Sequence, residues 1–507
     1  MSNLISQRLA FGDFQTSDEL AARICHLLAV RGIQPRSILE PSCGVGSLLL
    51  AALHEFQCVE SAVGIEINEQ YSAATNERLL RDGFDHKSSI TTSDFFGMDV
   101  PEIAAGLPQP VLIIGNPPWA TNARLSRLGS DNLPQKRNFK NLRGFDALTG
   151  RSNFDISEWF ILRLVDAFAR QQTTLALLCK TSVARQALTH LWRSDAPISA
   201  ASLHLIDAKR EFGAATDACL LLLSLDDSAK RCVSCCVFAD LDTTVRKSSF
   251  GLVGDRLVSD IQIFDKWSPL LSSERTIWRS GIKHDCAPVM ELTAIEGGFR
   301  NGLGEEFELE SLFVFPQIKA TDLFHGRIEG GNKAVIVTQR RIGEETSLIR
   351  HLAPLTWKYL IAHSELLDAR KSSIYRGKPR FSVFGIGAYS FAEWKVSISA
   401  LHKDIRFSIV GPRCDKATML DDTCYFLPIE NESTAGIVQR LLSSEPAREF
   451  LRSQVFWDSK RPITTEILGS LDLASLATLL GEPVPASHDW LNKKMRRPVS
   501  QVELFAR

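Results

Sequence analysis

The sequence has 507 residues, which is too many for one ordinary hydrophobic core, so two or three domains are expected. Hydrophobic residues make up 44% and charged residues 23% of the chain, a balance typical of globular proteins. The formal net charge of −1 excludes a strongly basic surface overall, so any surface for nucleic acid must be local. No apolar run is long enough to span a membrane, and no basic-then-apolar leader is present. A cytoplasmic protein without a membrane partner is therefore expected.

The sequence contains eleven cysteines and no export signal, which indicates reduced thiols. The only tight cluster is Cys232, Cys235 and Cys236. No second Cys or His pair stands at zinc-site spacing, so an apolar strand is expected there and no metal site.

The first third of the chain has the pattern of an α/β domain. Thr16 is expected to cap a helix that runs to about Val30, because Glu19 follows three residues later. Residues 37–40 then form a short apolar segment, and a loop with Gly44 and Gly46 leads into a helical run. Two glycines between a strand and a helix let a ligand approach the backbone closely at the edge of a sheet.

Two further strand-like segments each end in an acidic residue. Residues 62–66 end in Glu66, whose carboxylate is well placed to accept hydrogen bonds from two ribose hydroxyls. The next segment ends at Asp94, which could accept an adenine amino hydrogen, and at Phe95, which could stack on the ring. Each feature alone has an ordinary interpretation as a turn, a strand end, a helix cap or a core residue. Their order along the chain favours a nucleotide-binding sheet.

The fourth strand-like segment, residues 111–115, is followed by the sequence Asn-Pro-Pro-Trp at 116–119. The prolines fix φ and remove two backbone donors. The side chain of Asn116 and the carbonyl of Pro117 can therefore accept hydrogen bonds from a ligand, and Trp119 offers a flat apolar face. Two acceptors beside a stacking face suit a planar group that carries an NH2, such as an amide or the exocyclic amine of a nucleobase.

These motifs resemble the gamma class of N6-adenine DNA methyltransferases, which use S-adenosylmethionine. In that class a cofactor-side motif (here 11–16) precedes the glycine motif (40–46), the Asn-Pro-Pro-aromatic motif (116–119) and a target-recognition domain. The sequence departs from the common pattern in Trp119, where Tyr or Phe is usual, and in Cys43 and Val45 of the glycine motif. The resemblance implies a class I methyltransferase fold, Rossmann-like with a mostly parallel sheet, followed by an α+β target-recognition domain.

The resemblance also implies roles for individual residues. Asn116 and Pro117 would accept the amino hydrogens of a flipped-out adenine, and Trp119 and Phe212 would stack on its two faces. A plain core position is an equally good interpretation of Phe212, and Asn153 is expected to cap a helix. Methyl transfer would be direct, so the thiol of Cys43 should be dispensable. The residues expected to bind the cofactor are Thr16, Glu40, Ser42, Gly44, Gly46, Glu66, Asp94 and Phe95.

The segment after Trp119 is rich in basic residues. A polar segment beside the expected pocket would suit contacts with DNA phosphates, and a solvated mobile loop is the alternative. Its basic residues are Arg124, Arg127, Lys136, Arg137, Lys140, Arg143 and Arg151.

The C-terminal half has a weaker pattern. We expect a catalytic domain over 1–250, a linker over 251–289 and a target-recognition domain over 290–507. Residues 356–367 predict a helix, and residues 381–389 a glycine-bearing strand or turn. Lys378 and Arg380 beside that segment are expected to contact DNA.

The resemblance makes double-stranded DNA the expected partner of a monomeric modification enzyme, with a restriction endonuclease as a separate chain. A nuclease domain ahead of the first motif is not expected. Two alternatives remain open at this point. One is a methyltransferase for a protein glutamine or an rRNA guanine amine, which is also a planar NH2 group. The other is a DNA-recognition or methylation subunit of a larger phage-defence complex.

Overall fold

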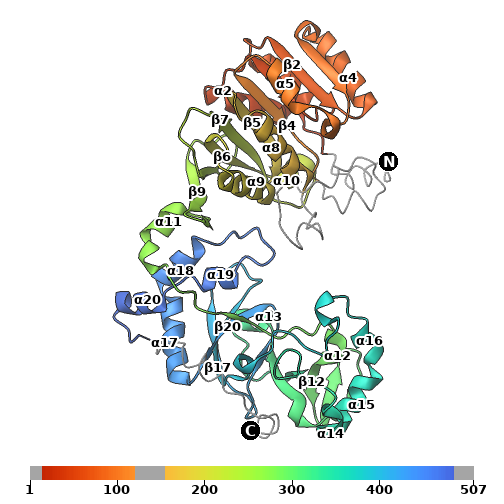
Figure 1. Cartoon of the computed structure of the whole chain (residues 1–507), viewed down its shortest axis with the longest axis vertical. Coiled ribbons are helices and arrows are strands. Elements are labelled where there is room, and N and C mark those ends of the chain that lie inside the picture. The colour runs from red at the N-terminus through yellow and green to blue at the C-terminus, as the bar shows by residue number, and fades with distance from the viewer. Residues whose placement is uncertain (1–13, 120–154, 485–507) are drawn as a thin grey trace. The chain divides into compact units, whose positions relative to one another are not determined.

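The computed structural model describes residues 14–119 and 155–484. The chain divides into two compact units at Ile261 and Gln262, and each is described by itself (Figure 1).

The first unit is built on a ten-stranded sheet. Its strand order is β10-β9-β8-β6-β7-β5-β4-β1-β2-β3. Strands β3, β2, β1, β4 and β5 are parallel neighbours, and β7 lies antiparallel between β5 and β6. The strands are β1 (Ser37–Glu40), β2 (Ser61–Glu66), β3 (Ser88–Thr92), β4 (Val111–Gly115), β5 (Thr173–Lys180), β6 (Ile198–Ile206), β7 (Ala218–Leu225), β8 (Ser234–Phe238), β9 (Arg246–Val253) and β10 (Arg256–Val258). The predicted α/β fold with a mostly parallel central sheet is therefore confirmed.

Helices follow the parallel strands, as a parallel sheet requires. Helix α5 packs against α8 and α8 against α9, while α2 packs against α3 (Figure 1). The helices are α2 (Asp18–Val30), α3 (Ser47–Glu55), α4 (Glu69–Arg81), α5 (Val100–Gly106), α8 (Ile156–Ala167), α9 (Thr181–Arg193) and α10 (Ala208–Phe212).

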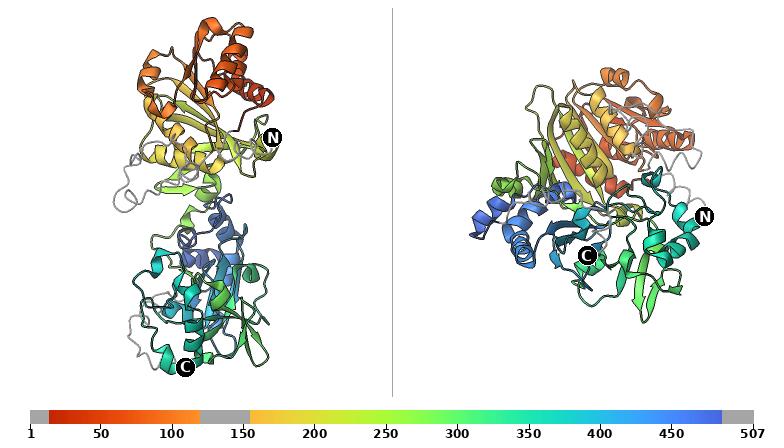
Figure 2. Two further views of the ribbon diagram at one scale, coloured as in Figure 1. Left: turned by 90° about the vertical axis from the view of Figure 1, so that its right-hand side faces the viewer. Right: turned by 60° about the horizontal axis from the view of Figure 1, so that its bottom comes forward.

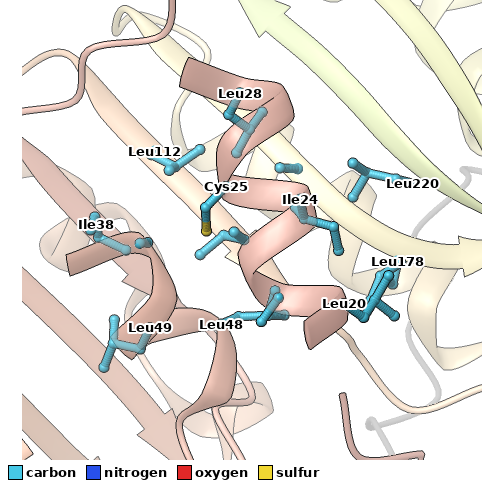
Figure 3. Close-up of a cluster of buried hydrophobic side chains, with 14 of the residues drawn as sticks. Leu20, Ile24, Cys25, Leu28, Ile38, Leu48, Leu49, Leu112, Leu178 and Leu220 are labelled. Atoms are coloured by element: carbon cyan, nitrogen blue, oxygen red, sulfur yellow. The ribbon is translucent and has the colours of Figure 1, made fainter. Parts of the chain in front are cut away.

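The core beneath α2 and α3 holds the loops of the first unit in place. Leu20, Ile24 and Leu28 recur along one side of α2, as an amphipathic helix requires, and are fully buried. They pack against side chains of alternate positions in the central strands, including Ile38, Leu112, Leu178 and Leu220 (Figure 3). This apolar contact fixes the helix that follows the first motif against the strands that carry the other motifs.

The N-terminal cap of α2 differs from the prediction. Ser17, not Thr16, is the cap, and its hydroxyl accepts from the backbone N–H of Leu20. The predicted capping box is therefore wrong by one residue. The hydroxyl of Thr16 is consequently available to the site, where it accepts from the side chain of Asn116.

The end of the first unit also differs from the expected domain boundary. Residues 251–258, which were expected to begin a linker, complete β9 and form β10 at the edge of the sheet. The cysteine cluster falls here as well, with Cys235 and Cys236 inside β8, so the strand predicted for it is confirmed.

The second unit is an α+β arrangement with two smaller sheets (Figure 2). One has the order β11-β20-β17-β18 and the other β14-β13-β12-β16-β15-β19. Their pairings are antiparallel except that of β15 with β19. The strands are β11 (Arg279–Ser280), β12 (Glu291–Ile295), β13 (Gly298–Asn301), β14 (Glu306–Phe307), β15 (Val314–Ile318), β16 (Lys333–Ile336), β17 (Trp394–Ser399), β18 (Phe407–Val410), β19 (Met419–Leu420) and β20 (Cys424–Ile429).

Two predictions in the second unit are refined by the structure. The helix expected over 356–367 is two helices, α15 and α16, separated at His363. Residues 381–389 form turns and the start of a 3-10 helix (Ala388–Phe391), with one bridge from Phe384 to Lys283. The helices of this unit are α11 (Ile261–Lys266), α12 (Ala287–Met290), α13 (Ala320–Phe324), α14 (Ile349–Leu352), α15 (Pro354–Ala362), α16 (Ser364–Asp368), α17 (Glu432–Ser443), α18 (Glu445–Arg452), α19 (Thr465–Leu468) and α20 (Leu473–Leu480). Within the described ranges, no helix has the length and apolar character needed to cross a membrane.

Candidate active site

The sequence motifs of the first unit meet at one edge of the sheet. Strands β3, β2, β1 and β4 are parallel neighbours in that order, so their C-terminal ends point to the same edge. The glycine loop follows β1, Glu66 ends β2, Asp94 follows β3, and Asn116 follows β4. This is the edge at which open α/β sheets bind their ligands.

The glycine loop has a conformation that only glycine adopts without strain. Gly44 has φ +53° and Gly46 has φ +79°, both in the left-handed region. A Cβ atom at Gly44 would lie 2.7 Å from the side-chain oxygen of Gln15, and one at Gly46 would lie 2.6 Å from Cγ2 of Thr75. The Thr75 hydroxyl is held by the carbonyls of Gly44 and Tyr71, so it has little freedom to move.

Two buried carboxyl groups hold this loop from opposite sides. Glu66 accepts from the backbone N–H of Gly44 through one oxygen and from that of Asn68 through the other, both at 2.8 Å. Glu40 accepts from the N–H of Leu49 at 2.9 Å, inside the first turn of α3. Burial raises the pKa of Glu40 well above its usual range, and the nearby Glu66 adds to the effect. Glu40 is 2% exposed, so its carboxyl group stabilises the loop from below the surface.

Other residues expected to bind the cofactor lie along the same edge. The hydroxyl of Ser42 is buried and has no hydrogen-bond partner among the described residues. Asp94 accepts from the N–H of Phe96 as the cap of a short 3-10 helix over 95–97. The ring of Phe95 stacks on Phe160, with centroids 4.6 Å apart. One face of Phe95 is therefore already covered by the protein.

The amide of Asn116 has one end fixed and one end free. Its nitrogen donates to the carbonyl of Phe14 at 2.6 Å and to the hydroxyl of Thr16 at 3.3 Å. A backbone carbonyl only accepts, so the group that faces it must be the NH2. The side-chain oxygen therefore points the other way, where it is buried and has no partner within the described residues. Such an atom is an acceptor that waits for a donor.

Three aromatic rings form a cluster at the end of the Asn-Pro-Pro-Trp motif. Trp119 lies 5.1 Å from Phe212 and 5.3 Å from Phe14 between ring centroids, and Phe14 lies 6.1 Å from Phe212. Trp119 and Phe212 meet edge to face, and Trp119 is only 3% exposed. A planar ring stacked between two others needs a separation of about 7 Å, or two van der Waals contacts. The two rings that were expected to stack on the base, Trp119 and Phe212, are thus in contact with each other. They must separate before a base can enter between them.

Phe14 is the part of this cluster that the sequence did not predict. It supplies both the carbonyl that orients Asn116 and a ring that packs on Trp119. The only signal was its position two residues before Thr16 within the first motif. A backbone carbonyl carries no sequence signature, so the contact could not be predicted.

The cysteine of the glycine loop is buried. The thiol of Cys43 is 4% exposed, and burial raises its pKa well above the usual range. A nucleophilic cysteine needs the thiolate, so Cys43 is unsuited to that role.

The residues expected to contact DNA fall into two sets. Lys378 and Arg380 lie in the second unit, where Lys378 is exposed and Arg380 forms an ion pair with Asp368. The pKa of Arg380 is raised by this carboxylate. The other set lies outside the described residues, together with Asn153; it comprises Arg124, Arg127, Lys136, Arg137, Lys140, Arg143 and Arg151.

The edge fits S-adenosylmethionine on the chemistry of its groups. Gly44 and Gly46 supply the left-handed backbone of the loop that follows β1, and the unpartnered hydroxyl of Ser42 can bind a polar ligand. Glu66 still has lone pairs for hydroxyl donors. Asn116 and Trp119 follow β4, the strand that pairs with β1.

Comparison with known proteins agrees with this fit. No family model matches the sequence. The type II methyltransferase M.NspV from Nostoc sp. (strain ATCC 29411 / PCC 7524) is 42% identical over 479 residues, which cover 94% of this chain and 99% of that protein. The type IIL restriction-modification enzyme MmeI, solved in complex with DNA, is similar in structure, with a TM-score of 0.51 and 14% identity. That match covers 90% of this chain and 64% of the longer MmeI chain, and it supports the fold alone.

The fold, its ligand-binding edge and the 42% identical relative together define a class I S-adenosylmethionine-dependent methyltransferase. The chain belongs to the type II methyltransferase family, the modification enzymes of restriction–modification systems. S-adenosylmethionine is accordingly its methyl donor.

Proposed function

We propose that this enzyme methylates the N6 amino group of adenine in double-stranded DNA. The observation that carries the proposal is the unpartnered, buried side-chain oxygen of Asn116, oriented by the carbonyl of Phe14. An adenine amino group would supply the missing donor. The aromatic cluster of Phe14, Trp119 and Phe212 would supply faces on which a purine can stack.

The residues of the site would activate a weak nucleophile. The lone pair of an aromatic amine is delocalised into the ring, and hydrogen bonds from both amino hydrogens draw the nitrogen toward tetrahedral geometry. Asn116 would accept one hydrogen through its side chain, and Pro117 would accept the other through its carbonyl. Both acceptors gain strength as positive charge develops on the nitrogen, so they favour the transition state over the ground state. S-adenosylmethionine supplies an activated methyl group on a sulfonium.

The closed aromatic cluster implies that entry of the base is a separate step. A base inside a duplex cannot reach this edge, so the nucleotide must flip out at a cost of a few kcal/mol. Trp119 and Phe212 must also part from their present edge-to-face contact. Stacking of the base between them would return roughly 1–3 kcal/mol per base.

The second unit is proposed to recognise the target sequence. The exposed Lys378 could bind a DNA phosphate directly. Arg380 would first have to break its ion pair with Asp368. Removal of a single lysine–phosphate interaction should reduce the salt slope of DNA binding by about one. Lys378→Gln is expected to lower that slope measurably, and an unchanged slope would remove Lys378 from the interface.

The direct test is an assay of the purified chain with S-adenosylmethionine and plasmid DNA, followed by sequencing that detects modified bases. N6-methyladenine within one recurring sequence is expected. Product on the cytosine N4 amine, or on RNA or protein only, would contradict the adenine assignment. Absence of product without further subunits would favour a role inside a larger assembly.

A further inference from the structure

A lysine at the end of β5 holds the backbone of the stacking tryptophan. Gly115 pairs with Leu177, so the last residues of β5 run beside the chain that leaves β4. The indole N–H of Trp119 donates to the carbonyl of Leu178 at 3.4 Å. The ammonium of Lys180 donates to the carbonyl of Trp119 itself at 3.1 Å. One strand end thus binds Trp119 at both its ring and its backbone.

Lys180 is itself held in place by a buried carboxylate. Its ammonium forms an ion pair with Asp155, whose side chain is only 6% exposed. The other oxygen of Asp155 accepts from the N–H and the hydroxyl of Ser157, at the start of α8. The ammonium is therefore positioned from two sides, and it joins the end of the Asn-Pro-Pro-Trp motif to the cap of α8.

The indole bond alone would hold Trp119 weakly. At 3.4 Å it is longer than a typical N–H···O bond of 2.7–3.2 Å. The charge-assisted bond from Lys180 to the backbone carbonyl is the shorter of the two.

We propose that Lys180 is a positioning residue that sets the backbone of Trp119, so that the indole ring meets the flipped base at the geometry needed for methyl transfer. This inference rests on the proposed function. It assigns Lys180 no contact with the base and no part in proton transfer. Its effect should appear in the rate of the chemical step, because a displacement of about 1 Å at a reacting group can cost on the order of 10²-fold in rate.

The test is a double-mutant cycle of Lys180→Met and Trp119→Ala, read by single-turnover methylation of DNA. Lys180→Met alone should slow turnover on the order of 10- to 100-fold, with the affinity for S-adenosylmethionine unchanged. In the Trp119→Ala background, the same change should cost less than about 2-fold, because residues that act through one another are non-additive. Full additivity, or a normal rate in the single variant, would overturn the proposal.

Lys87 offers a matched control. It also donates its ammonium to a backbone carbonyl, that of Val59, but it lies just before β3 at the opposite edge of the sheet. Lys87→Met should leave the single-turnover rate unchanged, and a loss equal to that of Lys180→Met would show that any lysine–carbonyl bond in this domain has the same effect.

Two milder variants keep the proposal testable if Lys180→Met does not fold. Asp155→Asn keeps an acceptor for Ser157 but removes the charge that positions the ammonium, so a smaller loss is expected. Lys180→Arg retains the charge and should recover part of the rate, and equal rates for both variants and the wild type would overturn the proposal. The product of the wild-type enzyme is identified before the variants are measured. If the proposed substrate is wrong, N6-methyladenine will be missing from the wild-type reaction, whereas a wrong role for Lys180 will appear only in the double-mutant cycle.

Discussion

The two halves of the active site differ in how complete they are. On the cofactor side, the glycine loop is fixed by Glu66, by Glu40 through α3, and by Thr75. On the base side, the rings of Trp119 and Phe212 touch each other, and the oxygen of Asn116 has no donor in the described part of the chain. Under the proposed function, the cofactor would meet a preformed surface, whereas the base would enter only when the aromatic cluster opens.

The largest expected effect comes from removing the acceptor on the base side. Asn116→Ala should lower turnover on the order of 10²-fold or more, because one preorganised polar partner of the transition state is lost. DNA binding and S-adenosylmethionine binding should persist, since the phosphate contacts and the glycine loop are unchanged. Single-turnover rates together with gel-shift titrations measure both, and normal turnover would refute the role of Asn116.

The second prediction tests whether Phe212 stacks on the base. Phe212→Ala should weaken the hold on the flipped base by roughly 1–3 kcal/mol, which lowers kcat/KM for DNA about 5- to 150-fold. Phe84→Ala is the matched control, because Phe84 is also partly buried against the same hydrophobic core but lies away from Trp119. A faster enzyme after Phe212→Ala would mean that the ring only blocks the pocket.

The third prediction tests the preformed cofactor side. Gly46→Ala places a side chain at φ +79° and against Thr75, which should cost about 1–2 kcal/mol and weaken S-adenosylmethionine binding roughly 5- to 30-fold. Gly83→Ala has nearly the same backbone angle, φ +76°, with no atom within 4 Å. Calorimetric titration should show normal affinity for the Gly83 variant, and equal losses in both would attribute the effect to backbone strain alone.

The smallest effect is a pH dependence that arises beneath the glycine loop. Burial raises the pKa of Glu40 above its ordinary value of 4.5, so the folded state favours the protonated carboxyl. Stability from this group is present below pH 4.5 and is lost as the pH rises toward the folded-state pKa. Glu40→Gln stays neutral and keeps an acceptor for Leu49. The melting temperature of Glu40→Gln minus that of the wild type should therefore increase from pH 4 to pH 8. A difference in stability of about 1 kcal/mol would correspond to a few degrees.

Glu60 provides the control of opposite sign. A hydrogen bond from Arg36 lowers the pKa of Glu60 below its ordinary value of 4.5, so Glu60→Gln should lose stability relative to the wild type as the pH rises toward 4.5, and the difference should stay constant at higher pH. A Glu40 variant whose advantage does not grow with pH would contradict the buried, protonated state of that carboxyl.

The sequence predicted which strands and motifs form the site, but not the contacts that position the residues of those motifs. Local patterns were enough to predict the glycine loop, Glu66 and the Asn-Pro-Pro-Trp motif, because each lies at the end of an apolar strand. The positions of these strands along the chain follow from the same patterns. The carbonyl of Phe14, the ammonium of Lys180 and the carboxylate of Asp155 come from distant segments that only the folded sheet brings together. The helix cap was placed one residue early because Thr16 and Ser17 are equally suitable caps by residue type.

Sequence patterns predicted the second unit less well than the first. Its strands are short and pair mostly antiparallel, and no strand–glycine–helix unit repeats within its described residues. Phe381 adopts φ +65° although it is not glycine, and the helix expected over 356–367 breaks at His363. Such features depend on tertiary packing, which overrides local preference.

The claim on which the account rests is that the side-chain oxygen of Asn116 accepts a hydrogen bond from the amino group of an extruded adenine. A crystal structure of the enzyme with a non-reactive cofactor analogue and duplex DNA carrying the mapped target would measure it directly. We expect the adenine N6 at about 2.7–3.2 Å from that oxygen, with Trp119 and Phe212 parted around the ring. An extruded base held elsewhere, or an Asn116 oxygen directed away from the amino group, would contradict the account.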